Sequence, residues 1–472
     1  MPSAESSNDP STRELRWYQG VPRYAWLVLI ICAMGWLFDT MDQHLFNLVR
    51  SNSVRELLEA NPALNNLTSG QMDAMTKSVG SQITAVFLLG WAAGGFLFGM
   101  VGDRLGRART MVITILCYAI FTGLNALVRT PTEYMICRFL TAMGVGGEFA
   151  AGAALVAETW PARSRPMALG LVQSLSAVGN MSAAVITYFM SAISWRYVFV
   201  VGAIPALLVV WIQLYIKEPD AWLKAREKAK ISGDKEVGSI LQLFREKDLR
   251  RNTFAGMLLA IAGVCGFWGV GVFMPDLIAS ACKPIIEHWP SIQALGPVPL
   301  IQKKAITAAI QVIKSKAFFL QMFGGFFGMY GYALLSQRVG RKPSLAIFLL
   351  AGLIVAEVAF NMVHDINTAY IWAFPLGFCG LAPFSAFAVY FPELYPTRLR
   401  ATGVGFCYNC ARILAAGAVL YQGVLVKMWA DPTNVDDSMG LRKAASVVAL
   451  IYLVGFVGLL IGPETKGKPL PE

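Results

Sequence analysis

The chain has 472 residues, of which 56% are hydrophobic and only 15% are charged, and its mean hydropathy is +0.54. Soluble domains carry about 25% charged residues, so this composition excludes an ordinary water-soluble domain. The net charge of +11 does not indicate nucleic-acid binding, because the basic residues lie in short loops between apolar blocks and act there as topology signals. We therefore expect the polypeptide to lie in a lipid bilayer.

Apolar blocks of about 18 to 25 residues recur along the chain, and as helices they are long enough to cross a hydrocarbon core of about 30 Å. We predict twelve spans, at residues 24–48, 79–101, 109–128, 132–156, 167–191, 197–216, 253–280, 316–335, 343–362, 368–391, 402–427 and 443–461. A charge-rich linker, 217–252, separates six spans from the other six. The predicted fold class is an all-α membrane protein of two six-helix bundles, 24–216 and 253–461, with tails at 1–23 and 462–472.

The short loops richest in arginine fall on one side of the predicted membrane, together with the linker and both termini. By the positive-inside rule this side is cytoplasmic. On the other side the insertion 282–315 is also rich in lysine, and we expect it to be either an ordered external cap or a flexible loop. The expected location is the inner cell membrane, with both termini cytoplasmic, and we expect a monomer.

Two loop motifs occur once in each half, at a nearly constant offset along the chain. The first motif comprises Gly102, Asp103, Arg104, Gly106 and Arg107 after span two, and Gln337, Arg338, Gly340 and Arg341 after span eight. The second comprises Glu158, Pro161, Arg163 and Arg165 after span four, and Glu393, Pro396, Arg398 and Arg400 after span ten. This repeat implies parallel halves related by an axis along the membrane normal. Because Gln337 stands where the first copy has Asp103, we expect any electrostatic latch to be weaker in the second half.

With these loops, the chain resembles the major facilitator superfamily over essentially its whole length, specifically the sugar-porter-like branch that also contains organic anion symporters. Further marks are Arg138 with Gly144, Gly146 and Gly147, then Trp195, Arg196, Glu218 and Pro219, and the ending Pro463 to Gly467. Span one, from Gly35 to Asp42, looks like that of proton symporters for carboxylates, sialate and aromatic acids. Span seven, from Gly266 to Gly271, lacks the paired glutamines typical of sugar porters.

Four ionisable residues in the spans are candidates for proton coupling. Asp39 and Asp42 lie near the middle of span one, where a charged residue costs about 2.5 to 3.5 kcal/mol and needs a reason. One of them is expected to carry a proton, with Asp42 favoured, or else to serve as a structural partner of another helix. Arg138 and Glu148 are ten residues apart on span four, about 15 Å along a helix, so each needs its own partner. The resemblance ties Arg138 to proton coupling, while Glu148 has a structural interhelical hydrogen bond as its alternative role.

Arg412, in span eleven, is the candidate for choosing the substrate, because a buried guanidinium can hold a carboxylate in a two-pronged contact. An internal ion pair with Asp276 or Glu357 is the open alternative. Neutral hydrogen bonds at a midplane site are expected from four polar side chains, or these residues join helices instead. They are Tyr408, Asn409, Gln173 and Gln321.

A cytoplasmic gate is expected where the two halves meet. Its predicted members are Asp103, Arg104, Gly106, Arg107, Glu158, Arg165, Arg338, Gly340, Arg341, Glu393 and Arg400. The resemblance places Asp103 near a helix N-terminus of the other half, a contact worth about 0.3 to 2 kcal/mol. The alternative is that these arginines only set topology, which explains neither the acidic residues nor the repeat.

The sequence favours a secondary transporter that moves a small organic anion with protons by alternating access. A uniporter or proton symporter for a sugar or polyol is the main alternative, and a solute sensor of the same fold is a remote one. The carboxylates lie on separate spans without a nucleophile and base, so we do not expect an enzyme. No phosphate-binding loop, metal site or cofactor is expected.

Overall fold

The computed structural model describes residues 16–64, 66–190, 194–203, 212, 215–232, 237–295, 299–429 and 438–471, and in these ranges the chain is helical without strands. The first half contains α1 (Arg23–Glu59), α2 (Ser69–Leu105), α3 (Arg107–Leu124), α4 (Pro131–Thr159), α5 (Arg165–Met190) and α6 (Trp195–Gly202). The linker region contains α8 (Asp220–Ser232) and α9 (Gln242–Arg245). The second half contains α10 (Lys247–Ala260), η4 (Ile261–Cys265), α11 (Gly266–Glu287), α12 (Pro290–Gln293), α13 (Pro299–Val339), α14 (Arg341–Met362), α15 (Ile366–Leu394), α16 (Arg400–Trp429), α17 (Ser438–Ala449) and α18 (Tyr452–Ile461).

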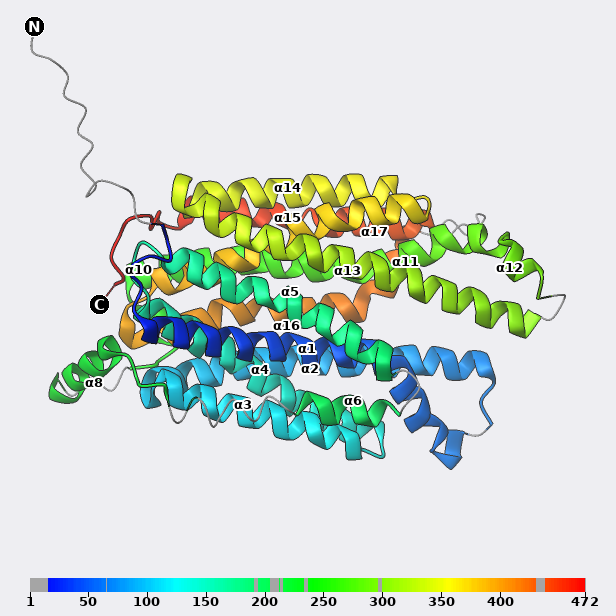
Figure 1. Cartoon of the computed structure of the whole chain (residues 1–472), viewed down its shortest axis with the longest axis horizontal. Helices are drawn as coiled ribbons and strands as arrows, with labels where there is room; N and C mark the ends of the chain where they lie inside the picture. Colours follow the sequence, from blue (N-terminus) through cyan, green and yellow to red (C-terminus); the bar gives the residue numbers. More distant parts are fainter. Residues whose placement is uncertain are drawn as a thin grey trace, which may run out of the picture.

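The long helices lie side by side and run roughly along the long axis of the molecule (Figure 1). Equivalent helices pack alike in the two halves, α2 on α4 in the first and α13 on α15 in the second. The halves join through two equivalent seams, α2 on α16 and α5 on α13. This pairing confirms the parallel internal repeat that the loop motifs predict.

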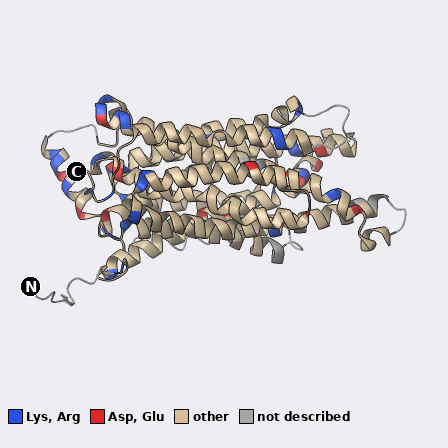
Figure 2. Ribbon diagram, turned by 90° about the horizontal axis from the view of Figure 1, so that it is seen from above, with Lys and Arg blue, Asp and Glu red and all other residues tan. Residues whose placement is uncertain are grey.

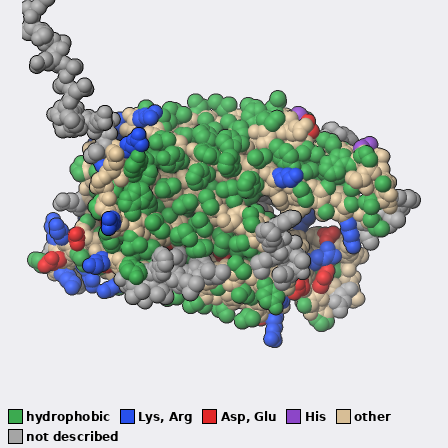
Figure 3. Space-filling model, in the orientation of Figure 1, with side chains coloured by type: hydrophobic (Ala, Val, Ile, Leu, Met, Phe, Trp, Pro, Cys, Tyr) green, Lys and Arg blue, Asp and Glu red, His purple; other side chains and the backbone are tan. Residues whose placement is uncertain are grey.

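Ten helical stretches of the described chain are long and apolar enough to cross a membrane. They agree with ten of the twelve predicted spans. The eleventh predicted span, 402–427, corresponds to α16, while the sixth, 197–216, begins as α6 and then lies largely outside the described residues. Figure 3 shows hydrophobic side chains covering the flank of the molecule, and Figure 2 shows charged residues concentrated at its two ends, as expected of a protein surrounded by lipid.

Both described termini, α8 and the repeated loops lie at one end of the molecule, here called the terminal end; the other is the opposite end (Figure 1). At the opposite end α1, α2 and α13 continue well past the predicted spans. The insertion 282–315 is not a loop: α11 continues to Glu287, α12 follows, and α13 begins at Pro299. Ile286, Ile292 and Ile313 are buried there in one apolar cluster, so the described residues of the insertion, 282–295 and 299–315, form an ordered helical cap.

Candidate functional site

The first site element is a buried ion pair between α1 and α4. Nη1 of Arg138 lies 3.0 Å from Oδ2 of Asp42, and both side chains are completely buried. The guanidinium also lies 4.5 Å from the ring centre of Phe46 and 4.4 Å from that of Phe87. The Oγ1 of Thr122 donates a hydrogen bond to the second oxygen of Asp42, at 3.0 Å. The Asp42 side chain is thus held in place by a guanidinium on one oxygen and a hydroxyl on the other.

The second element is a pair of carboxyl groups deeper in the same half. Asp39 of α1 and Glu148 of α4 are 0% and 2% exposed, and their side chains adjoin each other. None of the four carboxyl oxygens of Asp39 and Glu148 has a hydrogen-bond partner among the described residues. Glu148 also packs against Gly35, where a Cβ atom would collide with its carboxylate. Because two adjacent buried carboxylates without a cation repel each other strongly, this pair forms a natural site for one proton.

The third element surrounds Arg412 on α16. The side chain is 1% exposed, and its Nη1 donates to the backbone oxygen of Tyr408 at 2.7 Å and to Oδ1 of Asn409 at 3.0 Å. The Nε finds no acceptor among the described residues. No carboxylate of the described chain lies within ion-pair distance of Arg412, so the alternative pairing with Asp276 or Glu357 is wrong.

Aromatic rings enclose this guanidinium. Its central carbon lies 4.1 Å from the ring centre of Trp91 and 4.2 Å from that of Tyr408. Phe149 stacks on Tyr408 at 4.3 Å between ring centres, and Trp36 lies 4.8 Å from Phe149. The indole N–H groups of Trp36 and Trp91 are buried and have no acceptor among the described residues. Three unpaired donors, counting the Arg412 Nε, therefore gather around one aromatic enclosure.

The structure brings together most of the predicted binding residues. Gln173 of α5 is 2% exposed and lies near Tyr408 of the other half, and its Oε1 accepts no hydrogen bond from the described residues. Gln321 is set apart: it is half-buried on α13, and its backbone packs against Gly377 of α15. Gly95 on α2 leaves the room in which the Asn409 side chain lies.

Sequence reasoning missed Trp36, Trp91, Tyr118 and Thr122. Aromatic and hydroxyl residues are common in spans as packing and interface residues, so their types carry no functional signal alone. Position along the helix is the usable signal, because Trp36 lies one turn before Asp39 and Trp91 one turn before Gly95. Tyr118 has a buried hydroxyl without a described hydrogen bond and lies near the carboxyl groups of Asp39 and Glu148.

At the terminal end, the first copy of the gate closes across the two halves. Oδ1 of Asp103 accepts from the backbone N–H of Ala401 at 3.1 Å, and its Oδ2 accepts from the N–H and the hydroxyl of Thr402 at 2.8 and 2.6 Å. Glu158 lies 3.0 Å from Arg107 and 2.7 Å from Arg400. The carboxylate of Asp103 thus caps the N-terminus of α16, as the resemblance implied.

The second copy is held differently. The Nε2 of Gln337 donates to the backbone oxygen of Arg163 at 3.0 Å, so this side chain donates where Asp103 accepts. By the repeat spacing, Ala401 corresponds to Pro166, which has no N–H to offer a carboxylate. Glu393 pairs with Arg341 at 2.7 Å, whereas Arg165 donates to the backbone oxygen of Trp160. The closed gate therefore depends on the first copy.

Arg104 and Arg338, two further predicted gate residues, are exposed. The Nε of Arg104 donates to the backbone oxygen of Val237, and the backbone oxygen of Arg338 accepts from Lys466. Neither side chain has a described contact across the gate.

Gly106 and Gly340 shape the two loops at equivalent positions. Their φ angles are 116° and 114°, in the region that favours glycine. At each loop an acidic residue accepts from the first N–H groups of the next helix: Glu218 at α3 and Glu464 at α14. Partial burial would raise the pKa of Glu464, but these backbone donors hold it below its ordinary value.

We expect Asp103→Asn to weaken closure of the terminal end, because it removes the charge that caps α16. A helix-terminus contact of this kind is worth about 0.3 to 2 kcal/mol, which corresponds to about a 2- to 30-fold shift toward the open form. Hydrogen–deuterium exchange of the first turn of α16, which contains Ala401 and Thr402, measures that shift. Gln337→Ala is the matched control, and an equal rise in exchange in both variants would contradict a gate that depends on its first copy.

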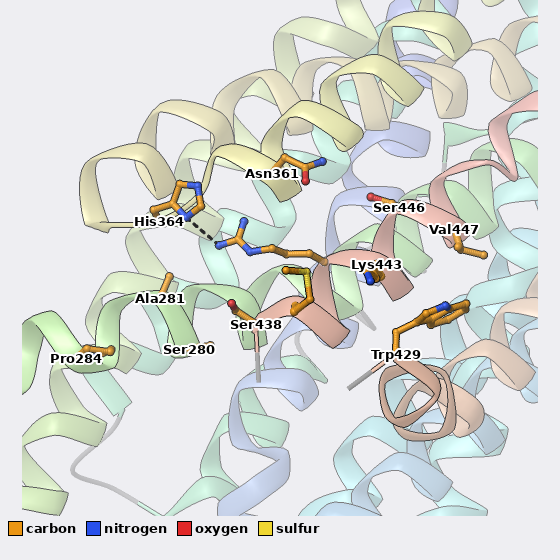
Figure 4. Close-up of a pocket in the computed structure, with 12 residues that line it drawn as sticks. Ser280, Ala281, Pro284, Asn361, His364, Trp429, Ser438, Lys443, Ser446 and Val447 are labelled. Carbon is orange, nitrogen blue, oxygen red and sulfur yellow. Dashed lines mark hydrogen bonds between the residues drawn. The ribbon is translucent and has the colours of Figure 1, made fainter. Parts of the chain in front are cut away.

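A cavity of about 930 Å³ lies away from these elements, between α11, α14 and α17. Figure 4 shows His364, Asn361 and Lys443 around it. The guanidinium of Arg442, which also lines it, donates to the backbone oxygen of Val363 at 2.6 Å and lies 3.3 Å from Nδ1 of His364. None of the predicted binding residues lines this cavity, so it is separate from the site around Arg412.

Comparison with known proteins agrees with this architecture. A family model described as Major Facilitator Superfamily matches residues 60–281. The chain is 29% identical over 442 residues to a probable 4-methylmuconolactone transporter of Cupriavidus pinatubonensis, which covers 92% of this chain and 90% of that protein. It is 27% identical to a cis,cis-muconate transport protein of Acinetobacter baylyi, over 81% of this chain and 84% of that protein.

Among solved structures, the proton:xylose symporter of Escherichia coli with bound 6-bromo-6-deoxy-D-glucose superimposes with a TM-score of 0.61. That match covers 95% of this chain and 98% of the other at 19% identity. At such an identity the likeness shows the fold alone.

Proposed function

We propose that this chain is a membrane transporter of the major facilitator type and that it moves a small organic acid by alternating access in symport with protons. The observation that carries this proposal is Arg412, a buried guanidinium at the seam between the two halves that has no carboxylate partner among the described residues.

A carboxylate substrate completes the site around Arg412. A buried cation without a counter-ion is costly, and a carboxylate accepts from the Nε and both indole N–H groups, for which the described residues offer no acceptor. Gln173 extends this site to the first half, and the substrate then touches both halves, as alternating access requires.

The aromatic walls favour a flat, conjugated acid. Trp36, Trp91, Phe149 and Tyr408 offer ring faces and edges on which a planar carbon skeleton packs well. One of the relatives reported above is a transport protein for cis,cis-muconate, a conjugated dicarboxylate.

Proton coupling is assigned to Asp39 and Glu148 rather than to Asp42. Asp42 is held by Arg138, while the other two carboxyl groups adjoin without a cation. Gly35, which packs on Glu148, is next to Trp36, and Phe149 follows Glu148 directly. A proton bound by Asp39 and Glu148 and a solute bound beside Trp36 and Phe149 therefore act on the same two helices, α1 and α4. This shared position offers a physical route for coupling.

The topology follows the positive-inside rule. The terminal end is cytoplasmic, residues 24–216 and 253–461 form the two moving halves, and the protein acts as a monomer in the inner membrane. Closure of the gate at Asp103 and Glu158 then represents a state closed to the cytoplasm.

Solute counterflow in liposomes tests this function. The purified protein is reconstituted and loaded with one unlabelled acid or sugar, and uptake of the labelled compound is followed at two pH values. We expect exchange of cis,cis-muconate and related planar acids, and accumulation when an inward proton gradient is imposed. Exchange of xylose or a polyol, without exchange of acids, would favour the sugar alternative. Acid uptake that ignores the gradient would remove the coupling.

A further inference from the structure

A second group of charges lies between the two halves toward the opposite end. It consists of Arg50 on α1, Lys77 on α2, Asp276 on α11 and Lys314 on α13, here called the outer cluster. The carboxylate of Asp276 lies close enough to interact electrostatically with both Arg50 and Lys314. Lys314 is also repelled by the like charge of Lys77. In the ribbon of Figure 2, residues coloured as Lys, Arg, Asp and Glu occur toward this end of the molecule.

The geometry holds this cluster at the seam. The Nη1 of Arg50 donates to Oγ1 of Thr84 at 2.8 Å, and the absence of a side chain at Gly80 leaves room for the Arg50 stem, whose Cδ would lie 3.4 Å from an added Cβ. His44 stacks on Phe318 with ring centres 4.1 Å apart, which brings α1 against α13.

The direction of the two helices places Arg50 and Lys314 together. From the contact between His44 and Phe318, Arg50 lies six residues further along α1 and Lys314 one turn back along α13. Because the two helices run in opposite directions, both shifts lead toward the opposite end. They amount to about 9 and 6 Å, at 1.5 Å per residue.

The neighbouring acids are already engaged. Asp73 lies 2.9 Å from Arg55, and Glu59 lies 2.7 Å from the same guanidinium. Glu56 accepts from Arg196 and from the indole of Trp195. The outer cluster itself contains three cations and one carboxylate, so it carries an excess of two positive charges.

We propose that the outer cluster is an entry site that captures the carboxylate group of the solute before it reaches Arg412. This inference rests on the proposed function, since it assumes an anionic solute. A mouth lined by one sign of charge concentrates anions of the other sign and raises their rate of association, and this effect falls with ionic strength. Lys77 is exposed and Lys314 is half-buried, so a solute can reach them from water.

The test measures uptake of labelled cis,cis-muconate by the double variant Lys77→Gln/Lys314→Gln in proteoliposomes, at low and high salt. We expect the half-saturating concentration at low salt to rise about five- to tenfold, with the maximal rate within about twofold of the original, and the difference to shrink at high salt. Lys304→Gln/Lys316→Gln is the matched control, because these lysines also lie on α13 and are exposed. Lys77→Glu should raise the half-saturating concentration further.

The outcomes separate the two claims. If the original protein takes up acids but the double variant has the same half-saturating concentration and salt dependence as the control, the entry site is refuted and the transport function stands. If the original protein exchanges no acid, the proposed function fails and the entry site with it.

Discussion

Arg412→Gln lowers the uptake of organic acids by at least about 30-fold at substrate concentrations well below saturation. Removing one partner of a buried, hydrogen-bonded charge pair costs about 2 to 5 kcal/mol, and each 1.4 kcal/mol is a factor of ten in affinity. The loss is expected mainly in the half-saturating concentration, since under the proposed function the guanidinium binds the solute. Counterflow of labelled cis,cis-muconate measures it.

Two further variants make this result specific. Arg412→Lys keeps the charge but loses the planar fork, so we expect an intermediate loss of about tenfold or more. Gln321→Ala is the control, because Gln321 is half-buried on α13 and no described hydrogen bond joins its side chain to the group around Tyr408. Unchanged acid exchange in Arg412→Lys, together with loss of exchange of neutral solutes, would show that the guanidinium does not read a carboxylate.

The membrane-embedded part of the fold was predictable because lipid imposes a simple rule on composition. The ends of several helices were not. Predicted span two begins at residue 79, whereas α2 begins at Ser69, and predicted span eight begins at 316, whereas α13 begins at Pro299. These extensions carry charged residues, such as Arg55 and Asp73 in their ion pair, and hydropathy cannot distinguish a hydrated helix from a loop.

Partners in the site were harder to predict than its members. The sequence shows that Arg138 and Glu148 are too far apart to pair, and the structure confirms that each has its own neighbour. Which neighbour depends on how α1 is rotated against α4, because Asp39 and Asp42 are three residues apart and face different parts of that helix. The rotation of α1 against α4 cannot be derived from a single sequence. From the sequence alone, Asp42 was therefore the favoured proton carrier.

For the gate, by contrast, the sequence alone contains the information needed to predict the difference between the two copies. The substitution of Gln337 for Asp103 predicts a weaker second latch, and in the structure Gln337 donates one hydrogen bond where Asp103 accepts three. The same repeat spacing aligns Pro166 with Ala401, and a proline there removes a donor that a carboxylate would need. Both the lost acceptor at Gln337 and the lost donor at Pro166 can therefore be identified in the sequence when the two motifs are aligned residue by residue.

We expect Asp39→Asn and Glu148→Gln to abolish accumulation driven by a proton gradient while leaving counterflow within about fivefold of the original rate. Under the proposed function this pair of buried carboxyl groups carries one proton, because two adjacent carboxylates repel each other, and one conformation takes up the proton that the other releases. An amide cannot release that proton, but it keeps the shape and most of the packing. Uptake with and without an imposed gradient, compared with exchange at equal pH, separates coupling from movement of the solute.

Asp42→Asn provides the contrast that decides between the two carboxylate sites. It leaves the Arg138 charge buried without its partner, and breaking such a pair costs about 3 to 5 kcal/mol, so exchange and accumulation should fall together. If Asp42→Asn instead lost only accumulation, and Asp39→Asn with Glu148→Gln still concentrated the acid, the proton would be carried by the ion pair. The opposite pattern locates it on the pair that has no cation, because only there does protonation relieve a repulsion rather than break an attraction.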